Sequence, residues 1–503
     1  MASSGILLKY GVALIHDADD HVRAIKTDVL IENGRIVKIA PTISRPDGIK
    51  VIDCTDKIIS PGFVDTHHHG WQTQLKGRHA NEQLLEYMVT GNIQHHQYSP
   101  EDVFYGQLAG MLEGIAAGTT TVVDHAHITR SADHVKLAIA ATASSGIRSV
   151  FCYTPLVRVK HFNPLTFHMN PFEDWVMATF TKLADVGPFG SGRVTLGFAF
   201  DLFFLPADII KGIFAHVKAK GVQTITCHGS VSLGSVVQSL AKLDLLDDRI
   251  IISHGGTLRR ADADLIKAAG AYLSSTPSTE LQMAMGRPYC FDSSFADGGV
   301  SGDSVGLQNN SSLGVDCHSC TAGSVISEAK LGLQDARNHF NEFRMKQGKF
   351  PRSLPDNLSV EAAFNLATIK GAEAAHLSHE IGRIAEGYKA DLTIFDALSP
   401  SMVGAAQHDP VAAVILHSSP ADIETVIVDG VVRKQNGNLA PVTVDEGAKQ
   451  VIGEPILEWT SIAREVLKSR EKMQEDINKI DFEEAPAALL ELFHVDESTL
   501  INV

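Results

Sequence analysis

The amino-acid sequence predicts an α/β protein, a (β/α)₈ TIM barrel with a small β-sandwich formed by the N- and C-terminal segments. Three observations lead to this prediction. Short segments rich in β-branched and aromatic residues alternate with helical patterns between residues 62 and 318. Both ends of the chain show a different pattern of strands and tight turns. The chain also has 503 residues, well beyond the roughly 250 of a typical barrel.

The predicted barrel strands share a run of β-branched or aromatic residues, and most precede a helical pattern. They span residues 62–69, 119–127, 148–154, 193–201, 223–230, 249–256, 271–278 and 311–318. Helices are predicted at 101–118, which follows Ser99-Pro100 and ends on glycine, and at 206–221, which begins with proline and ends on glycine. Repeated alternation of strand and helix indicates a parallel sheet, and eight strands are the number that this closed barrel needs.

The flanking segments have their own pattern. Residues 28–40 are predicted to form a strand, an Asn-Gly turn and a second strand. Residues 382–395 and 425–433 show a similar pattern of short strands and turns. We therefore expect a composite β-sandwich domain from residues 1–60 and 382–439, with a catalytic barrel at 61–381 inserted between its halves. Residues 440–503, with a charged helix around 459–480, are expected to form a helical arm on the surface or in a subunit contact. A homodimer or higher homo-oligomer is expected.

Composition narrows the class of partner. The formal net charge of −16 argues against broad contact with nucleic acid or an anionic membrane, because phosphate backbones are bound mainly by basic patches. No apolar run is long enough to span a membrane, and the first residues lack the pattern of a secretion signal. We therefore expect a cytoplasmic protein with a small-molecule substrate. The six scattered cysteines are expected to be free thiols.

The strongest local signal is the histidine triplet that ends the first predicted strand. His67 and His69 are two positions apart, so their side chains share one face of the strand. At the carboxyl end of a barrel strand that face points into the mouth, where two imidazoles can hold one metal ion. Adjacent histidines can also be simple surface polarity, and the triplet alone does not exclude that reading.

Later strands add metal-competent side chains at the same rim. His228 ends the fifth predicted strand, His254 the sixth and Asp316 the eighth. Three histidines and one carboxylate suit zinc or iron, with a position left for water. A divalent ion lowers the pKa of bound water towards about 7, which produces hydroxide near neutral pH. Asp316 could bind the ion and also accept the proton that the water loses, or it could be a buried carboxylate that caps a loop.

These residues resemble the amidohydrolase superfamily, in particular its metal-dependent deaminases and chlorohydrolases of the guanine, 8-oxoguanine, adenosylhomocysteine and triazine type. The similarity covers nearly the whole chain and rests on residues 61–69, 118–124, 253–255, 314–316 and 381–392 together with His228. It implies that His67, His69, His228 and Asp316 bind a single divalent metal ion, zinc first and iron second. It also implies that His254 polarises the substrate or relays protons, although an imidazole that only orients Asp316 is an alternative.

Other side chains are candidate substrate contacts. Gln72 and Trp71 lie in a stretch that resembles oxopurine deaminases, in which glutamine binds the ring, and Trp71 could stack on a flat substrate. Both could equally pack the first loop. His125 and His127 end the second predicted strand at the same rim, although either could be a core histidine. His318 is a further candidate. It lies in Cys317-His318-Ser319-Cys320, whose C-x-x-C spacing we interpret as loop because it directly follows Asp316.

The sequence departs from the deaminases at two positions. Val231 stands three residues after His228, where the deaminases carry the glutamate that protonates the leaving amine. Glu280, after the seventh predicted strand, could replace it, or it could be a solvated loop residue. Phe198-Ala199-Phe200-Asp201 ends the fourth predicted strand without a lysine, so the carboxylated-lysine bridge of two-metal relatives is absent from the sequence and one ion is expected.

Three functions remain open at this stage. The first is a metal-dependent hydrolase acting on a carbon–nitrogen bond, other than a peptide bond, in a small aromatic or heterocyclic substrate. The second is a non-hydrolytic lyase, decarboxylase, dehydratase or isomerase on the same scaffold, which Val231 would favour. The third is a metal-binding or assembly protein without catalysis. The segment 161–175, rich in aromatics, prolines and histidines, is expected to cover the mouth as a lid.

Overall fold

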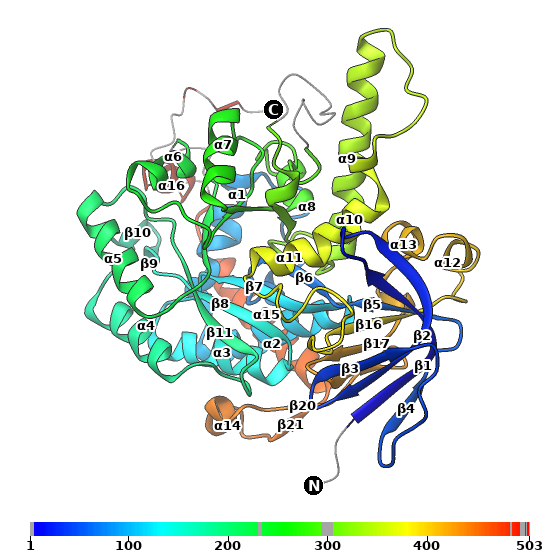
Figure 1. The fold of residues 1–503 in the computed structure, drawn as a ribbon. Coiled ribbons are helices and arrows are strands. Elements are labelled where there is room, and N and C mark those ends of the chain that lie inside the picture. Colours follow the sequence, from blue (N-terminus) through cyan, green and yellow to red (C-terminus); the bar gives the residue numbers. More distant parts are fainter. Residues whose placement is uncertain are drawn as a thin grey trace.

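A computed structural model describes residues 5–229, 234–292, 305–482, 485–492, 498, 500 and 501. Eight parallel strands form one sheet in the order β15-β14-β13-β12-β11-β8-β7-β6 (Figure 1). These strands are β6 (Phe63–His68), β7 (Thr119–Ala126), β8 (Arg148–Tyr153), β11 (Val194–Ala199), β12 (Ile225–His228), β13 (Ile250–Ser253), β14 (Tyr272–Ser275) and β15 (Ser311–Leu313). Each of the eight lies within a predicted strand.

The sheet closes where the first strand meets the chain after the last. The backbone of Asp316 pairs in parallel with His68. The Asp316 N–H donates to the His67 carbonyl at 2.8 Å, and the His69 N–H donates to the Asp316 carbonyl at 3.0 Å. The predicted barrel is thus confirmed, and its seam lies among the predicted metal ligands.

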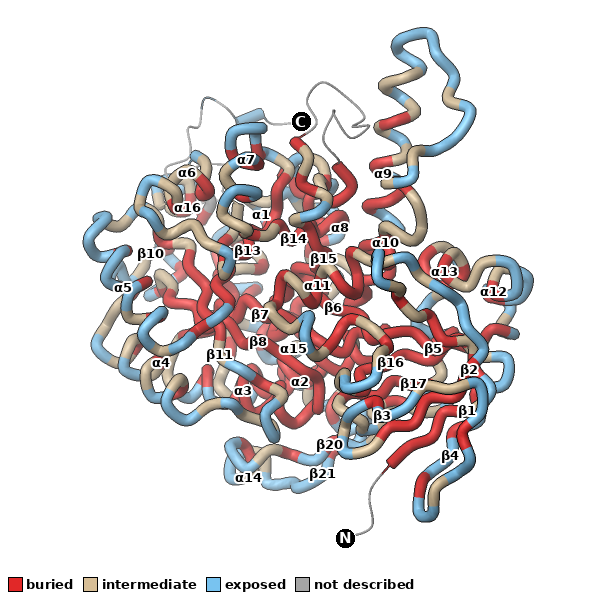
Figure 2. Tube along the Cα trace, in the orientation of Figure 1, coloured by how far each residue is buried: buried red, intermediate tan, exposed pale blue. Residues whose placement is uncertain are grey.

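Helices cover the barrel wall, and the strands within it are buried (Figure 2). The entry and exit residues that predicted α2 and α5 are found at their ends: Ser99 caps α2, which begins with Pro100, and Pro206 directly precedes α5. The described wall helices are α2 (Pro100–Ala116), α3 (Ala132–Ser145), α4 (Asp174–Val186), α5 (Ala207–Ala219), α6 (Val236–Lys242), α7 (Arg260–Ala269), α8 (Pro277–Gln282), α9 (Val325–Lys346), α10 (Val360–Ala367) and α11 (Ile369–Ala374).

The two ends of the chain form a separate mixed sheet, in the order β19-β18-β17-β16-β5-β1-β2-β3 with β4 beside β1. Its strands are β1 (Gly5–His16), β2 (Val22–Glu32), β3 (Arg35–Ala40), β4 (Lys50–Asp53), β5 (Lys57–Pro61), β16 (Leu392–Asp396), β17 (Ile423–Val428), β18 (Val431–Gln435) and β19 (Asn438–Leu439). The join between the two ends is the antiparallel pair β5–β16. The expected N- and C-terminal β unit is therefore present, while its exact boundaries stay a prediction.

Two further segments approach the first barrel loop. The hairpin of β9 (Arg158–Phe162) and β10 (Leu165–His168) overlaps the first half of the predicted lid region, 161–175. The helix α15 (Trp459–Ile477) packs against α2 and the short 3-10 helix Gln72–Leu75. The smaller C-terminal elements are α12 (Ala405–His408), α13 (Pro410–Ala412), α14 (Glu446–Ile452) and α16 (Ala485–Leu492). Within the described residues, no helix is both long and apolar enough to cross a membrane.

Candidate metal centre

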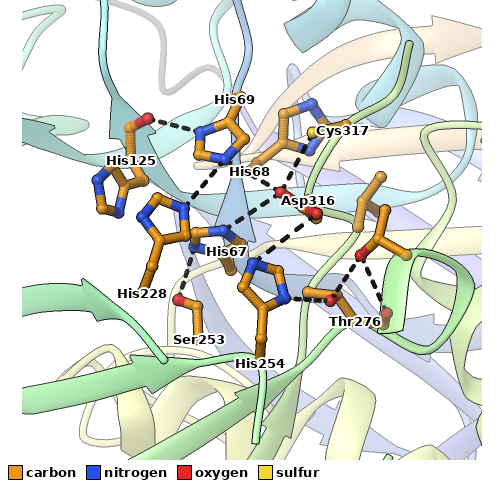
Figure 3. Close-up of polar contacts among 12 residues, drawn as sticks. His67, His68, His69, His125, His228, Ser253, His254, Thr276, Asp316 and Cys317 are labelled. Atoms are coloured by element: carbon orange, nitrogen blue, oxygen red, sulfur yellow. Dashed lines mark hydrogen bonds and ion pairs between the residues drawn. The ribbon is translucent and has the colours of Figure 1, made fainter. Parts of the chain in front are cut away.

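The four predicted ligands converge at the carboxyl mouth of the barrel (Figure 3). His69 Nε2 lies 3.0 Å from Asp316 Oδ1, and His67 Nε2 lies 3.4 Å from the same oxygen. His228 Nε2 is 3.4 Å from His69 Nε2. His67, His69 and Asp316 are buried, whereas about a quarter of the His228 side chain is exposed, at 27%. Side chains from three distant strands therefore meet within one small volume.

Each of the three imidazoles is held by its other nitrogen. His69 Nδ1 donates to the backbone carbonyl of His125 at 2.8 Å. His228 Nδ1 donates to Asp201 Oδ2 at 2.9 Å. His67 Nδ1 lies 2.7 Å from Ser253 Oγ (Figure 3). A carbonyl or carboxylate oxygen can only accept, so the protons of neutral His69 and His228 sit on Nδ1. Their Nε2 lone pairs consequently face the centre of the cluster.

This arrangement fits a bound cation. His67 Nε2 has no hydrogen-bond partner among the described residues, and the lone pairs of His69 and His228 face each other. Bare nitrogens and a carboxylate oxygen crowded together repel one another unless positive charge lies between them. Ligand atoms about 2.0–2.1 Å from a tetrahedral zinc ion are separated by about 3.3–3.4 Å. The observed spacings of 3.0–3.4 Å match that separation.

The electrostatic environment favours neutral His67 and charged Asp316, the forms that bind a metal ion, and it favours positive charge at His228. Burial holds the pKa of His67 well below its ordinary value, so this imidazole is neutral. Burial would raise the pKa of Asp316, but His254, His67 and His69 outweigh it and hold that pKa well below its usual range. Burial opposes a charge on His228 too, yet Asp201 raises the pKa of this histidine. The position of Asp201 thus favours positive charge at the His228 ring.

His254 lies beside the ligand histidines, with its ring centroid 5.0 Å from that of His67 and stacked on His228 at 5.5 Å. Its Nε2 is 3.8 Å from Asp316 Oδ2, whereas the other carboxylate oxygen faces His67 and His69. Its Nδ1 is 2.7 Å from Thr276 Oγ1 (Figure 3). Burial lowers the pKa of His254 to about 4, so the ring is neutral near pH 7. His254 Nε2 thus faces Asp316, while the predicted role of His254 in proton transfer or substrate polarisation stays a prediction.

His125 and His127 both reach the cluster, in different ways. His125 Nε2 lies 3.1 Å from Asp201 Oδ2, and the His127 ring centroid is 3.9 Å from that of His69. His127 Nε2 has no hydrogen-bond partner within the described part of the chain. Burial lowers the pKa of His125 to about 3 and holds that of His127 well below its ordinary value. Substrate contact by either ring stays a prediction.

The predicted substrate contacts in the first loop, Trp71 and Gln72, form hydrogen bonds to other side chains of the protein. Trp71 Nε1 donates to His127 Nδ1 at 3.2 Å, and Gln72 Nε2 donates to Tyr87 Oη at 2.7 Å. Both side chains are fully buried. His318 is also buried, with its two nitrogens 2.9 Å from His68 Nε2 and from Thr73 Oγ1. These contacts support the packing alternative for Trp71 and Gln72, and substrate binding by these residues and His318 remains untested.

The residues of the unusual C-x-x-C spacing lie directly after the barrel seam. Cys317 and Cys320 are free thiols, and the Cys320 N–H donates to the Cys317 carbonyl at 2.9 Å, which closes a turn. Cys317 Sγ lies 3.3 Å from Asp316 Oδ1 and 3.0 Å from Tyr87 Oη. The thiol therefore packs beside a predicted ligand oxygen.

Of the two residues discussed in place of the deaminase glutamate, Val231 and Glu280, the structure describes only Glu280. Val231 lies outside the described residues. Glu280 is fully buried in α8, and burial raises its pKa to about 8. Its two carboxylate oxygens accept the backbone N–H groups of Gly255 and Thr276. The predicted role of Glu280 in proton transfer is not tested by these contacts.

Three residues that the sequence did not single out support the cluster: Asp201, Ser253 and Thr276. Asp201 ends the fourth barrel segment at the same rim as the histidines, and that position was a usable signal. Ser253 and Thr276 each bind the Nδ1 atom of one histidine. Short hydroxyl side chains are common in turns, so neither residue carried a distinguishing pattern.

A closed parallel barrel with a His/Asp cluster at its carboxyl mouth is an arrangement used by metal-dependent barrel hydrolases. Residues 58–433 match the model of the amidohydrolase family, and the chain belongs to this family. The predicted resemblance is therefore confirmed, together with the predicted class of enzyme, a metal-dependent hydrolase acting on carbon–nitrogen bonds other than peptide bonds.

Two curated relatives span most of the chain. A 5-methylthioadenosine/S-adenosylhomocysteine deaminase of Acetivibrio thermocellus is 26% identical over 409 residues, covering 79% of this chain and 85% of the relative. A 5'-deoxyadenosine deaminase of Methanobrevibacter smithii is 26% identical over 458 residues, covering 89% and 96%. The similarity thus extends beyond the barrel into the terminal segments.

Solved structures confirm the fold. An adenosine deaminase from Xanthomonas campestris with bound zinc superposes with a TM-score of 0.73 at 18% identity, covering 94% of this chain and 99% of the other. An atrazine chlorohydrolase from Arthrobacter aurescens, complexed with zinc, gives a TM-score of 0.72 at 18% identity and covers 92% and 100%. Barrel and terminal sheet therefore recur together in these proteins.

Proposed function

We propose that this protein hydrolyses a C–N bond of a small heterocyclic substrate, and that deamination of an adenine-type nucleoside is the first reaction to test. The convergence of proton-free Nε2 atoms and the Asp316 carboxylate on one point carries the proposal. The names of the two curated relatives, both deaminases of adenosine derivatives, support the choice of substrate class. A small molecule is therefore the expected partner.

His67, His69, His228 and Asp316 would hold one divalent ion, zinc in preference to iron. Zinc-bound structural relatives support that preference. When bound, the ion would lower the pKa of a water molecule towards about 7 and so supply hydroxide near neutral pH. Asp316 Oδ2 faces away from His67 and His69, so this oxygen is free to accept a proton from water. His254 Nε2, 3.8 Å away, would carry that proton or polarise the substrate.

The test combines metal analysis with turnover. The purified full chain should contain about one zinc per protomer and release ammonia from at least one compound in a panel of adenine nucleosides and aminotriazines. Asp316→Ala should lose both bound metal and turnover, by at least about 100-fold in kcat/KM, because it removes a ligand and the proton acceptor. Full activity of metal-free protein or of Asp316→Ala would overturn the proposal.

Val231 supports a second candidate, a non-hydrolytic lyase, decarboxylase, dehydratase or isomerase, because valine cannot protonate a leaving amine. Turnover in ¹⁸O-labelled water separates the two. Hydrolytic deamination places one solvent oxygen on the carbon that loses ammonia. A product that forms without solvent oxygen would favour the second candidate.

A further inference from the structure

Glu280 bridges two strand ends beside the metal centre. Its Oε1 accepts the N–H of Gly255 at 2.9 Å, and its Oε2 accepts the N–H of Thr276 at 3.2 Å. Gly255 directly follows His254 at the end of β13, and Thr276 directly follows β14. One carboxylate therefore fixes the backbone on both sides of the His254 side chain.

We propose that Glu280 is a positioning residue that holds His254 at its place beside Asp316. This inference rests on the proposed function, in which His254 acts on the proton or the substrate. The connection runs through two routes. One is the Gly255 backbone, and the other is Thr276, whose Oγ1 lies 2.7 Å from His254 Nδ1.

The backbone conformation of His254 explains why the hydrogen bonds of Glu280 are needed to hold it. Its φ angle is +66°, in the left-handed region that residues with a side chain rarely adopt. Such a conformation persists only where surrounding contacts hold it. The His254 N–H donates to the Ser274 carbonyl at 3.1 Å, and the next N–H, of Gly255, donates to Glu280. Loss of Glu280 removes the second of these two anchors.

The same contacts argue against direct proton delivery by Glu280. Both carboxylate oxygens point at backbone amides in the barrel wall, and the side chain is fully buried. In the described part of the chain, no hydrogen bond or ion pair links this carboxylate to His254, Asp316 or the ligand histidines. Burial raises the pKa of Glu280 to about 8, which is a consequence of the same enclosure.

Glu328 provides a matched control. It is equally buried, on α9, and its carboxylate also forms two hydrogen bonds to α8, to Ser278 N at 2.8 Å and to Ser278 Oγ at 2.6 Å. Neither bond reaches Thr276 or Gly255. Glu328→Ala therefore also removes two buried hydrogen bonds at α8, but it leaves the bonds from Glu280 to Gly255 and Thr276 intact.

The experiment is a double-mutant cycle on the metal-loaded full chain with its best panel substrate. Glu280→Ala should lower kcat about 10- to 100-fold with little change in KM or metal content, because a misplaced catalytic group loses rate rather than binding. In a His254→Ala background, the same substitution should lower kcat less than about twofold further, because its target is gone. Thr276→Val, which removes only one hydroxyl, should reproduce part of the loss, so the test survives if Glu280→Ala fails to fold.

Two kinetic results would overturn the proposal. One is a full additional loss on adding Glu280→Ala to His254→Ala, which would indicate an independent role such as proton delivery. The other is an equal fall in kcat for Glu328→Ala, which would indicate general loss of structure. A crystal structure of Glu280→Ala gives a readout without any substrate: His254 should leave φ +66° and move from Asp316. An unmoved His254 would refute the inference, whether or not any panel compound is turned over. Lack of turnover with every panel compound would count against the proposed function and not against the position of Glu280.

Discussion

Asp201 shows how one side chain can orient two histidines. Its Oδ1 accepts the backbone N–H of His228 at 2.8 Å, and its Oδ2 lies 2.9 Å from His228 Nδ1 and 3.1 Å from His125 Nε2. Burial would raise the pKa of Asp201, but the two histidines outweigh this effect and hold that pKa well below its usual range. The carboxylate is therefore charged, and it directs His228 Nε2 towards the ligand cluster.

Replacing Asp201 with alanine should weaken zinc binding about 10- to 100-fold, because removing the hydrogen-bond partner of a ligand histidine typically lowers metal affinity by that factor. Competition with a chromogenic chelator measures the affinity. Asp208→Ala removes the same charge from the exposed start of α5 and should leave the affinity unchanged. Equal affinity in wild type and Asp201→Ala would show that His228 needs no such partner.

Glu328 predicts a pH dependence of stability. Burial raises its pKa to about 7 from an ordinary value of 4.5, with Asp65 and Asp316 adding to the effect. Between these values the folded protein binds more protons than the unfolded chain, so the free energy of unfolding falls as pH rises. The contribution is complete below about pH 4.5 and lost above about pH 7.

Glu328→Gln removes this titration while keeping partners for Ser278, since an amide can both accept from the N–H and donate to Oγ. Its stability relative to wild type should therefore rise by up to about 3 kcal/mol between pH 5 and pH 8. Denaturation midpoints at the two pH values give the comparison, with Glu342→Gln on the exposed face of α9 as the charge control. A difference that does not change with pH would contradict the prediction.

At the scale of elements, the sequence predicted the barrel strands well because each is a short apolar run that ends in a polar rim residue. The observed strands are shorter than predicted at this rim. The eighth was expected to reach His318, but β15 ends at Leu313, and Asp316 has a φ of +63°. The chain leaves the strand conformation to turn its carboxylate towards His69. Such a departure depends on tertiary contacts, which local periodicity does not encode.

The helix α15 matches the charged helix expected near residue 459, but its contacts could not be read from the sequence. Arg470 Nη1 donates to the backbone carbonyls of Gln74 at 2.5 Å and Lys76 at 3.0 Å, and Ser469 Oγ accepts from Gln74 Nε2 at 3.1 Å. The C-terminal helix thus fixes the loop that follows the first two predicted ligands.

Arg470→Ala should therefore destabilise the protein by about 1–3 kcal/mol, because it leaves two partly buried carbonyls without their charged donor. It should also speed hydrogen exchange in residues 72–78, where the loop would open locally. Thermal unfolding and exchange mass spectrometry provide the two measurements. Lys468→Ala, on the exposed side of α15, should change stability by less than about 0.5 kcal/mol. Unaltered hydrogen exchange in residues 72–78 of Arg470→Ala would show that Arg470 does not hold this loop.

At the scale of the whole molecule, a buried ion pair joins the barrel to the terminal sheet. Arg148, the first residue of β8, contacts Asp391 through Nε at 2.8 Å and Nη2 at 3.2 Å. Asp391 directly precedes β16 and also accepts the N–H of Asp429. The pattern of strands predicted both units from the sequence, but the pairing of two residues so far apart could not be seen there.

Arg148→Met should cost about 3–5 kcal/mol, because it leaves the Asp391 carboxylate buried without its partner. Adding Asp391→Asn should recover part of this loss, since the second change removes the unpaired charge. Chemical denaturation of the two variants tests both statements. A double variant less stable than Arg148→Met alone would argue against the pair as described.

The seam of the barrel has a consequence for how the molecule is made. Across the junction, the Asp316 N–H donates to the His67 carbonyl and the His69 N–H donates to the Asp316 carbonyl. Nearly half of the chain lies between His67 and Asp316. A nascent chain on the ribosome therefore lacks the Asp316 carboxylate, and cannot close the barrel, until translation has passed the eighth strand. If Asp316 binds the ion as proposed, ring closure also completes the ligand set, so we expect metal-free barrels to open first at this junction.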